Sequence, residues 1–132
     1  MSKFILDTDI CIYWLKGNEN IEKTIIRSGL ENVFITIITE CELFYGAFKS
    51  KRKEKNLAVI EELKKNIQIL HTRENTAYIY GTIKSELEIK GQILDDADLL
   101  IASIAISNNA TIVTNNTEHF RRIPELKIEN WK

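Results

Sequence analysis

A chain of 132 residues has the length of one domain and can bury a hydrophobic core. With 44% hydrophobic and 28% charged residues, its composition is that of a globular protein and excludes a disordered one. A net charge of −1 excludes a basic field over the whole surface, as found in many duplex-binding proteins, but not an enzyme that contacts a few phosphates.

The cysteines and the distribution of apolar residues indicate in which cellular compartment the protein is expected. Cys11 and Cys41 lack metal-ligand spacing, and we expect both to be small, reduced core residues. The first residues do not resemble a signal peptide, and no apolar run reaches the ~20 residues that span a bilayer. We therefore expect a cytoplasmic protein without membrane contact, organised as one domain over residues 1–132.

In the first half of the chain, apolar segments alternate with helical patterns. Strands are expected where β-branched, aromatic and aliphatic residues cluster, at Lys3–Leu6 and Val33–Thr36. Helices are expected where apolar residues recur with helical spacing between capping and stop signals. These are Ile10–Lys16 after a Thr8 cap, Ile21–Ser28, about Thr39–Phe48, and Lys53–Asn66.

The same alternation continues in the second half. The expected elements are a strand at Ile67–Leu70, helices at Asn75–Lys90 and Asp95–Asn109, a strand at Thr111–Val113, and an edge strand at Leu126–Ile128. Strands that alternate with helices imply crossover connections and a sheet covered on both faces. We predict an α/β fold, a Rossmann-like three-layer α/β/α sandwich with a mostly parallel sheet of four to five strands.

Three carboxylates occupy positions where an ionised group is costly without a partner. Asp7 ends the first apolar strand, Glu42 opens a helix, and Asp98 lies within an apolar helix. In parallel sheets, ligands bind beyond the carboxyl ends of the strands. Acids that meet there repel one another unless a divalent cation lies between them. The sequence therefore points to metal-dependent phosphodiester chemistry.

Each acid also has a purely structural interpretation. Asp7 suits the cap of the helix that follows it. Glu42 completes a capping-box pattern with Thr39, whose amide it would reach. Asp98 takes the third position of its helix, where the helix dipole favours an acid, but its alanine neighbours leave room for a ligand.

Other polar and aromatic residues are expected near the same edge. Asn116, in the turn after the fourth strand, suits a tight turn or a hydrogen bond to phosphate. The basic run at residues 49–55 is typical of a solvated helix surface, and the alternative is contact with a phosphate backbone. Tyr13, Trp14 and Tyr45 would either stack on bases or pack in the core or a dimer interface.

Several segments carry, in order, the motifs of one known family. They are Leu6-Asp7-Thr8-Asp9-Ile10, Glu42-Leu43-Phe44-Tyr45-Gly46-Ala47, Gly91 to Ala102 with Asp98, Thr114-Asn115-Asn116 before Phe120, and Glu129-Asn130-Trp131. With these motifs the chain resembles the PIN-domain ribonucleases, and specifically the VapC toxins of bacterial and archaeal toxin–antitoxin pairs. The likeness covers nearly the whole chain and implies a single PIN-like domain.

This resemblance implies an activity and partners. The activity is that of an Mg²⁺- or Mn²⁺-dependent endoribonuclease, the toxin of a type II pair, which hydrolyses looped or single-stranded RNA such as tRNA and leaves 5′-phosphate ends. Asp7 and Asp98 would bind the metal, and Asp7, Glu42, Asp98 and Asn116 would form the catalytic set. A VapB-like antitoxin would block the site, and the toxin would form a homodimer and a hetero-oligomer with the antitoxin.

The chain departs from the family pattern at three positions. Residue 9 is Asp where the family usually has Asn, which adds negative charge beside Asp7. Asn116 stands where many members have a fourth acid, and His119 where relatives often carry an acid. A neutral Asn116 can orient water or phosphate but adds no charge for a second metal ion.

Two other functions remain open from the sequence. Asp7 and Asp9 fit the Asp-x-Asp opening of haloacid-dehalogenase-type phosphatases, as nucleophile and acid/base. Cys11 and the lack of a later Lys and Gly-Asp motif count against that class. The second alternative is a non-catalytic module whose acids bind a basic peptide.

Overall fold

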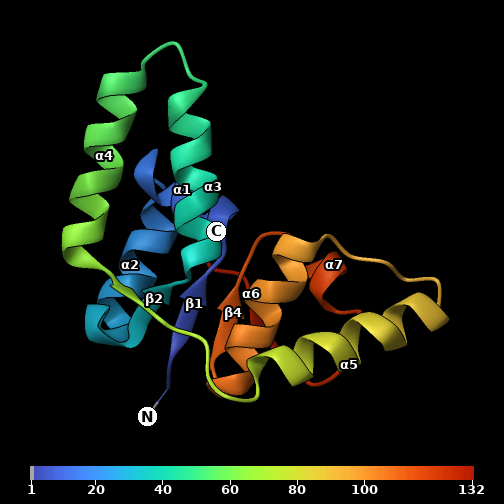
Figure 1. Cartoon of the computed structure of the whole chain (residues 1–132). Helices are drawn as coiled ribbons and strands as arrows, with labels where there is room; N and C mark the ends of the chain where they lie inside the picture. The colour runs from blue at the N-terminus through green and yellow to red at the C-terminus, as the bar shows by residue number, and fades with distance from the viewer. Residues whose placement is uncertain (1) are drawn as a thin grey trace.

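The computed structural model of the chain describes residues 2–132. Over that range, five strands form one parallel sheet in the order β3-β2-β1-β4-β5 (Figure 1). The strands are β1 (Phe4–Leu6), β2 (Val33–Ile35), β3 (Gln68–Ile69), β4 (Thr111–Val113) and β5 (Lys127–Glu129). Each predicted strand is therefore present, and β5 is shifted by one residue from its expected position.

The helices connect successive strands. They are α1 (Thr8–Leu15), α2 (Glu19–Ser28), the 3-10 turn η1 (Leu30–Asn32), α3 (Ile37–Phe48), α4 (Lys53–Asn66), α5 (Thr76–Ile89), α6 (Asp96–Ser107) and α7 (Thr117–Phe120). The short η1 and α7 were not predicted, because one turn of helix leaves no periodic pattern in the sequence.

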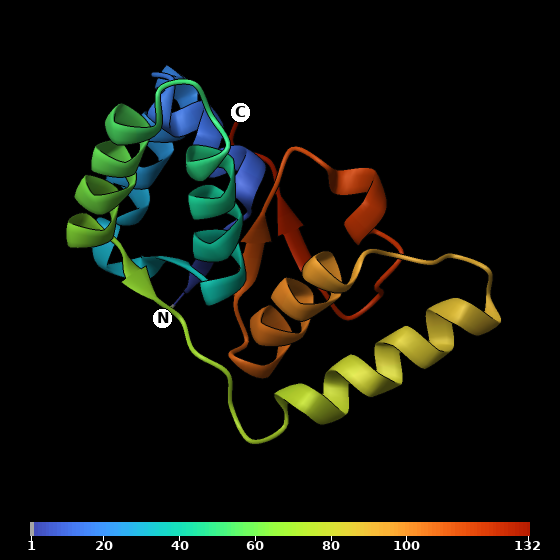
Figure 2. The same cartoon turned by 45° about the horizontal axis from the view of Figure 1, so that its top comes forward.

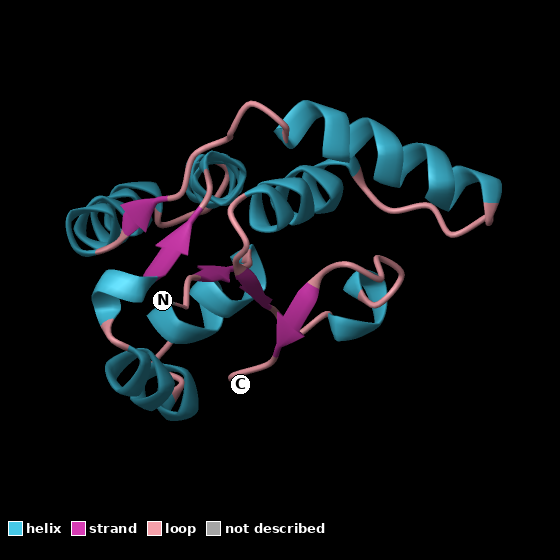
Figure 3. Cartoon of the chain, turned by 90° about the horizontal axis from the view of Figure 1, so that it is seen from below, coloured by secondary structure: helices cyan, strands magenta, loops and turns pink. Residues whose placement is uncertain are grey.

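Two hydrophobic cores lie on opposite faces of the sheet. Figures 1 and 2 show α1 to α4 on one side of the strands and α5 to α7 on the other, and Figure 3 shows the same layers from below. Side chains alternate between the faces, so that Ile5 and Ile112 pack with α5 and α6, whereas Leu6 and Val113 pack with α1 to α4. The predicted three-layer α/β/α sandwich is confirmed.

The start of α3 and the exposure of one of its residues differ from the prediction. The helix begins at Ile37, and the hydroxyl of Thr36 caps it by accepting a hydrogen bond from the Thr39 amide at 3.4 Å. The buried stripe of α3 follows helical spacing, from Thr39 through Leu43 to Ala47. Cys41 lies between these positions and points outward, so its predicted place in the core was wrong, whereas Cys11 is buried as expected.

Across the part of the chain that the structure describes, no helix is both long and apolar enough to cross a bilayer.

Candidate active site

The candidate site lies at the carboxyl ends of the two central strands. β1 and β4 are neighbours, with Leu6 paired to Val113, so the residues that follow them emerge side by side. The backbone amide of Asp7 donates to the carbonyl of Val113 at 2.8 Å. The sequence motifs of Asp7 and Thr114, far apart in the chain, therefore meet at one edge of the sheet.

Asp7 is both a helix cap and a buried acid. Its Oδ1 accepts a hydrogen bond from the Thr8 amide at 2.9 Å, and its Oδ2 accepts one from the Thr114 hydroxyl at 2.8 Å. Burial raises the pKa of the Asp7 carboxyl to about 7, and the negative charge of Asp9 adds to this rise. The two hydrogen bonds oppose it. The alternatives of a cap and a site residue are thus not exclusive.

Asp9 is a second acid of the same turn and is half-buried. Its Oδ2 accepts a hydrogen bond from the Asn115 amide at 3.1 Å, which ties the loop after β4 to the start of α1. Within residues 2–132, its Oδ1 is the one buried side-chain oxygen or nitrogen without a hydrogen-bond partner. Burial also raises the pKa of Asp9 above its ordinary value. A positively charged ligand would stabilise such a carboxylate.

Asp98 lies on α6, which packs on the opposite face of the sheet from α1. It is the third residue of α6, as predicted, and is half-buried. Burial raises its pKa, and the charges of Asp95, Glu42 and Asp9 raise it further, whereas His119 lowers it. The charge of Asp98 in turn raises the pKa of Asp7 slightly. These mutual effects show that acids from separate elements are close enough to influence one another's ionisation.

Glu42 does not have the capping role that the sequence suggested. It is the sixth residue of α3, in the second turn rather than the first, and the cap is Thr36. Its Oε1 instead accepts a hydrogen bond from the Thr8 hydroxyl at 2.5 Å. Glu42 is therefore held toward the turn that carries Asp7, and the capping-box interpretation was wrong because α3 starts earlier than its apolar pattern indicates.

Asn116 is joined to Asp7 through Thr114. The Thr114 hydroxyl donates to Asp7 and accepts a hydrogen bond from the Asn116 amide at 3.0 Å. The side-chain nitrogen of Asn116 lies 2.7 Å from Nδ1 of His119, and His119 is exposed. The sequence indicated that the Thr114 segment suits a tight turn or hydrogen bonds to a phosphate, and it did not predict that Thr114 links Asp7 to Asn116.

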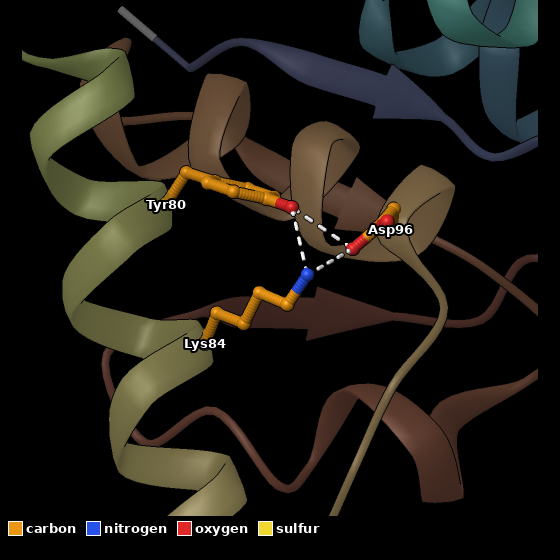
Figure 4. A network of polar contacts seen from close by, with 3 residues as sticks. All are labelled: Tyr80, Lys84 and Asp96. Atoms are coloured by element: carbon orange, nitrogen blue, oxygen red, sulfur yellow. Dashed lines mark hydrogen bonds and ion pairs between the residues drawn. The ribbon is translucent and has the colours of Figure 1, made fainter.

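The start of α6 is held in place by a polar network on the surface (Figure 4). The Tyr80 hydroxyl and the Lys84 ammonium donate to Oδ1 of Asp96 at 2.9 and 2.8 Å. The Asp96 carboxylate raises the pKa of Lys84, and Lys84 lowers that of Asp96. The network joins α5 to the first turn of α6, which carries Asp98.

The three aromatic residues that were predicted near the site differ in their exposure to solvent. Tyr13 and Trp14 are half-buried and pack against the core, and the ammonium of Lys132 lies 4.0 Å from the centre of the Tyr13 ring. Tyr45 on α3 is 66% exposed. Of the three candidates for base stacking, Tyr45 is the one whose ring is mainly open to solvent.

The donor set fits a hydrated divalent cation. In the described part of the chain, no group of three or more His, Cys, Asp or Glu side chains lies so that it could hold a metal ion by itself. Mg²⁺ needs few direct protein ligands, because it retains several waters and binds through one or two carboxylates. The carboxyls of Asp7 and Asp98, with the unpartnered Oδ1 of Asp9 beside Asp7, supply the hard oxygen atoms that such an ion prefers.

Comparison with known proteins agrees with this architecture. The PIN domain family profile matches residues 4–126. Ribonuclease VapC2 of Rickettsia felis is 39% identical over 130 residues, which cover 97% of each chain. The tRNA(fMet)-specific endonuclease VapC of Salmonella typhimurium is 37% identical over 131 residues, which cover 99% of each.

A solved structure shares the fold along its full length. The crystal structure of DNA-bound VapBC from Salmonella typhimurium contains a chain that superposes with a TM-score of 0.92 at 38% identity, covering 100% of both chains. The chain therefore belongs to the PIN-domain family, and within it to the VapC ribonucleases.

Proposed function

We propose that this protein is a metal-dependent endoribonuclease that acts as the toxin of a type II toxin–antitoxin pair. The observation that carries the proposal is a pair of hydrogen bonds, one from Thr8 beside Asp7 to Glu42 of α3, and one from Thr114 after β4 to Asp7. In addition, the charges of Glu42 and Asp9 raise the pKa of Asp98 on α6. Acids from three elements are gathered at the edge where an α/β sheet binds its ligands. The names of the VapC relatives supply the reaction class.

Asp7 and Asp98 would hold the metal ion, which we propose to be Mg²⁺ or Mn²⁺. When bound, such an ion stabilises negative charge on the reacting phosphate and favours deprotonation of a coordinated water. In the metal-free protein, burial raises the pKa of both carboxyls. A bound cation would lower these pKa values, because it stabilises the ionised form of each acid.

The remaining residues would orient the reactants. Glu42, fixed by the hydrogen bond from Thr8, would accept the proton of the attacking water. Asn116 would donate its side-chain amide to a phosphate oxygen. The water oxygen bonds to phosphorus as the bond to the 3′-oxygen breaks, so the products carry a 5′-phosphate and a 3′-hydroxyl. The ribose 2′-hydroxyl is not the nucleophile.

The proposed substrate is single-stranded or looped RNA, and tRNA is the first candidate. Splayed bases and phosphates are accessible in loops but not in a duplex. The Salmonella relative is named as specific for tRNA(fMet), which supports a tRNA substrate without deciding which one.

The proposed partner is a VapB-like antitoxin that occupies a groove beside the site. The groove has a volume of about 420 Å³ and lies between α1, α3 and α4, with Ile12, Leu15, Leu43 and Val59 among its apolar walls. Glu42 also lines it, so a peptide in the groove reaches the catalytic edge. The solved relatives include VapBC complexes. Toxin homodimers, hetero-oligomers with the antitoxin and a cytoplasmic location remain predictions.

Incubation of the purified protein with total tRNA tests the proposal directly. We expect cleavage with Mg²⁺ or Mn²⁺, none with EDTA, and 5′-phosphates at the mapped ends. If the tRNA stays intact both with Mg²⁺ and with Mn²⁺, the proposed function is contradicted. Membership of the PIN-domain family does not favour the phosphatase or the acidic binding module. An Asp9→Asn variant that still cleaves RNA would remove the phosphatase alternative.

A further inference from the structure

The C-terminal end of α3, the turn after it and the first residues of α4 carry a concentration of positive charge. This basic tip consists of Lys49, Lys51, Arg52, Lys53 and Lys55. Glu54 is the one acidic residue between Lys49 and Lys55, in a protein whose net charge is −1. None of the ion pairs formed within residues 2–132 involves a member of the basic tip, so its charge is not neutralised by the protein itself.

Exposed aromatic rings accompany these cations. Tyr45 is 66% exposed and Phe48 is 59% exposed, although both are large apolar side chains. The Lys49 ammonium lies 4.7 Å from the centre of the Tyr45 ring, and the Lys53 ammonium lies 5.8 Å from that of Phe48. Cations beside open aromatic faces are the combination with which proteins bind single-stranded nucleic acid.

The tip is connected to the candidate site along one helix face. Glu42, Tyr45 and Lys49 are separated by three and four residues, and such positions share a face of α3. Seven residues of helix rise by about 10 Å, so Lys49 lies a short distance beyond Glu42. In Figure 1 the turn between α3 and α4 lies at the end of α3 farthest from the sheet. A single strand of RNA that leaves the catalytic edge along this face would pass Tyr45 before it reaches the basic tip.

We propose that this face of α3 is the binding track for single-stranded RNA that leads into the candidate active site. A base stacks on Tyr45, and Lys49 and Lys53 contact backbone phosphates. The inference rests on the proposed ribonuclease function and adds the residues that hold the substrate outside the reacting bond. An acidic peptide would complement the lysines, but it would give the two exposed rings no partner, whereas RNA satisfies both features.

Binding of a fluorescently labelled single-stranded RNA, measured by anisotropy in EDTA over a series of salt concentrations, tests the track without cleavage. We expect the Lys49→Glu/Lys53→Glu variant to bind at least tenfold more weakly. The log–log slope of its salt dependence should fall by about 0.7 for each phosphate that the variant no longer binds. Tyr45→Ala should weaken binding about tenfold and Tyr45→Phe should restore it, since stacking needs the ring and not the hydroxyl.

Lys90→Glu is the matched control, because Lys90 is an exposed lysine at the end of α5. It should bind RNA as the parent protein does, and thermal unfolding should show that every variant is folded. Parent-like RNA binding by the Lys49→Glu/Lys53→Glu variant would overturn the inference. So would a defect confined to antitoxin binding, which would make the face a protein interface. Failure of the parent protein to cleave RNA would instead overturn the proposed function.

Discussion

The hydroxyl of Thr114 donates a hydrogen bond of 2.8 Å to Oδ2 of Asp7 across 107 positions of sequence. The contact exists because β1 and β4 are adjacent parallel strands whose carboxyl ends coincide. The same hydroxyl accepts the Asn116 amide, so one small side chain fixes the acid and the loop that presents Asn116.

Replacement of Thr114 by Val should therefore affect both stability and activity. Valine keeps the shape but leaves the Asp7 carboxyl and the Asn116 amide without their partner, at a cost of about 1–3 kcal/mol in the free energy of unfolding. Denaturant unfolding and RNA cleavage by the same preparation measure the two effects. Thr114→Ser keeps the hydroxyl and should behave nearly as the parent protein. Equal stability of all three proteins would show that the hydrogen bond is unimportant.

Removal of either proposed metal ligand should abolish cleavage. Asp7→Asn and Asp98→Asn keep the size of each side chain but remove the negative charge that a divalent cation requires. Cleavage of total tRNA should fall to background, and the far-UV circular dichroism should stay unchanged. Glu74→Gln, an exposed substitution before α5, is the control. An unimpaired rate in either asparagine variant would refute the assignment.

Glu42 should be needed for the rate more than for metal binding. Glu42→Gln keeps an oxygen that can accept the Thr8 hydroxyl but cannot take a proton from water, so we expect kcat to fall about 100-fold or more. Single-turnover cleavage and Mn²⁺ titration measure the two properties. Glu40→Gln removes a carboxylate of the same helix that lies 3.4 Å from Lys64, and it should leave kcat unchanged. Wild-type kcat in Glu42→Gln would exclude a role as base.

The metal-free protein should lose stability as the pH rises. The folded-state pKa of Asp7 is about 7, above the ordinary 3.8, so the folded protein holds this proton more tightly than the unfolded chain. The resulting stabilisation is complete below pH 4 and is lost as the pH approaches 7, at roughly 4 kcal/mol for the full effect. The raised pKa values of Asp9 and Asp98 act in the same direction.

Urea unfolding in EDTA at pH 5 and pH 8 measures this dependence. Asp7→Asn has no charge to ionise and should be more stable than the parent protein at pH 8, with a smaller difference between the two pH values. Mg²⁺ should stabilise the parent protein at pH 8, because it binds the ionised site of the folded state. A parent protein whose stability increases from pH 5 to pH 8 in EDTA would contradict the proposed burial of Asp7.

Local sequence patterns were sufficient to predict the regular elements of the fold. Apolar segments and helical periodicity predicted the five strands and the longer helices, because these signals lie within a few neighbouring residues. The start of α3 was placed too late, since the Thr39 pattern imitates a cap that Thr36 provides. That error also gave Glu42 a capping role. Cys41 was misplaced for a different reason, because it was assigned to the core as a free cysteine, whereas the buried stripe of Thr39, Leu43 and Ala47 leaves it facing outward.

The sequence by itself determined the kinds of groups available, Asp7, Glu42, Asp98 and Asn116, and its motifs resemble those of VapC proteins although Asn116 departs from the usual acid. Only the tertiary structure decided which groups are coupled. Strand order brings Thr114 to Asp7, and packing buries the Asp7 carboxyl while leaving Tyr45 open. Local sequence specifies backbone conformation, whereas burial and charge coupling depend on contacts between residues distant in the chain.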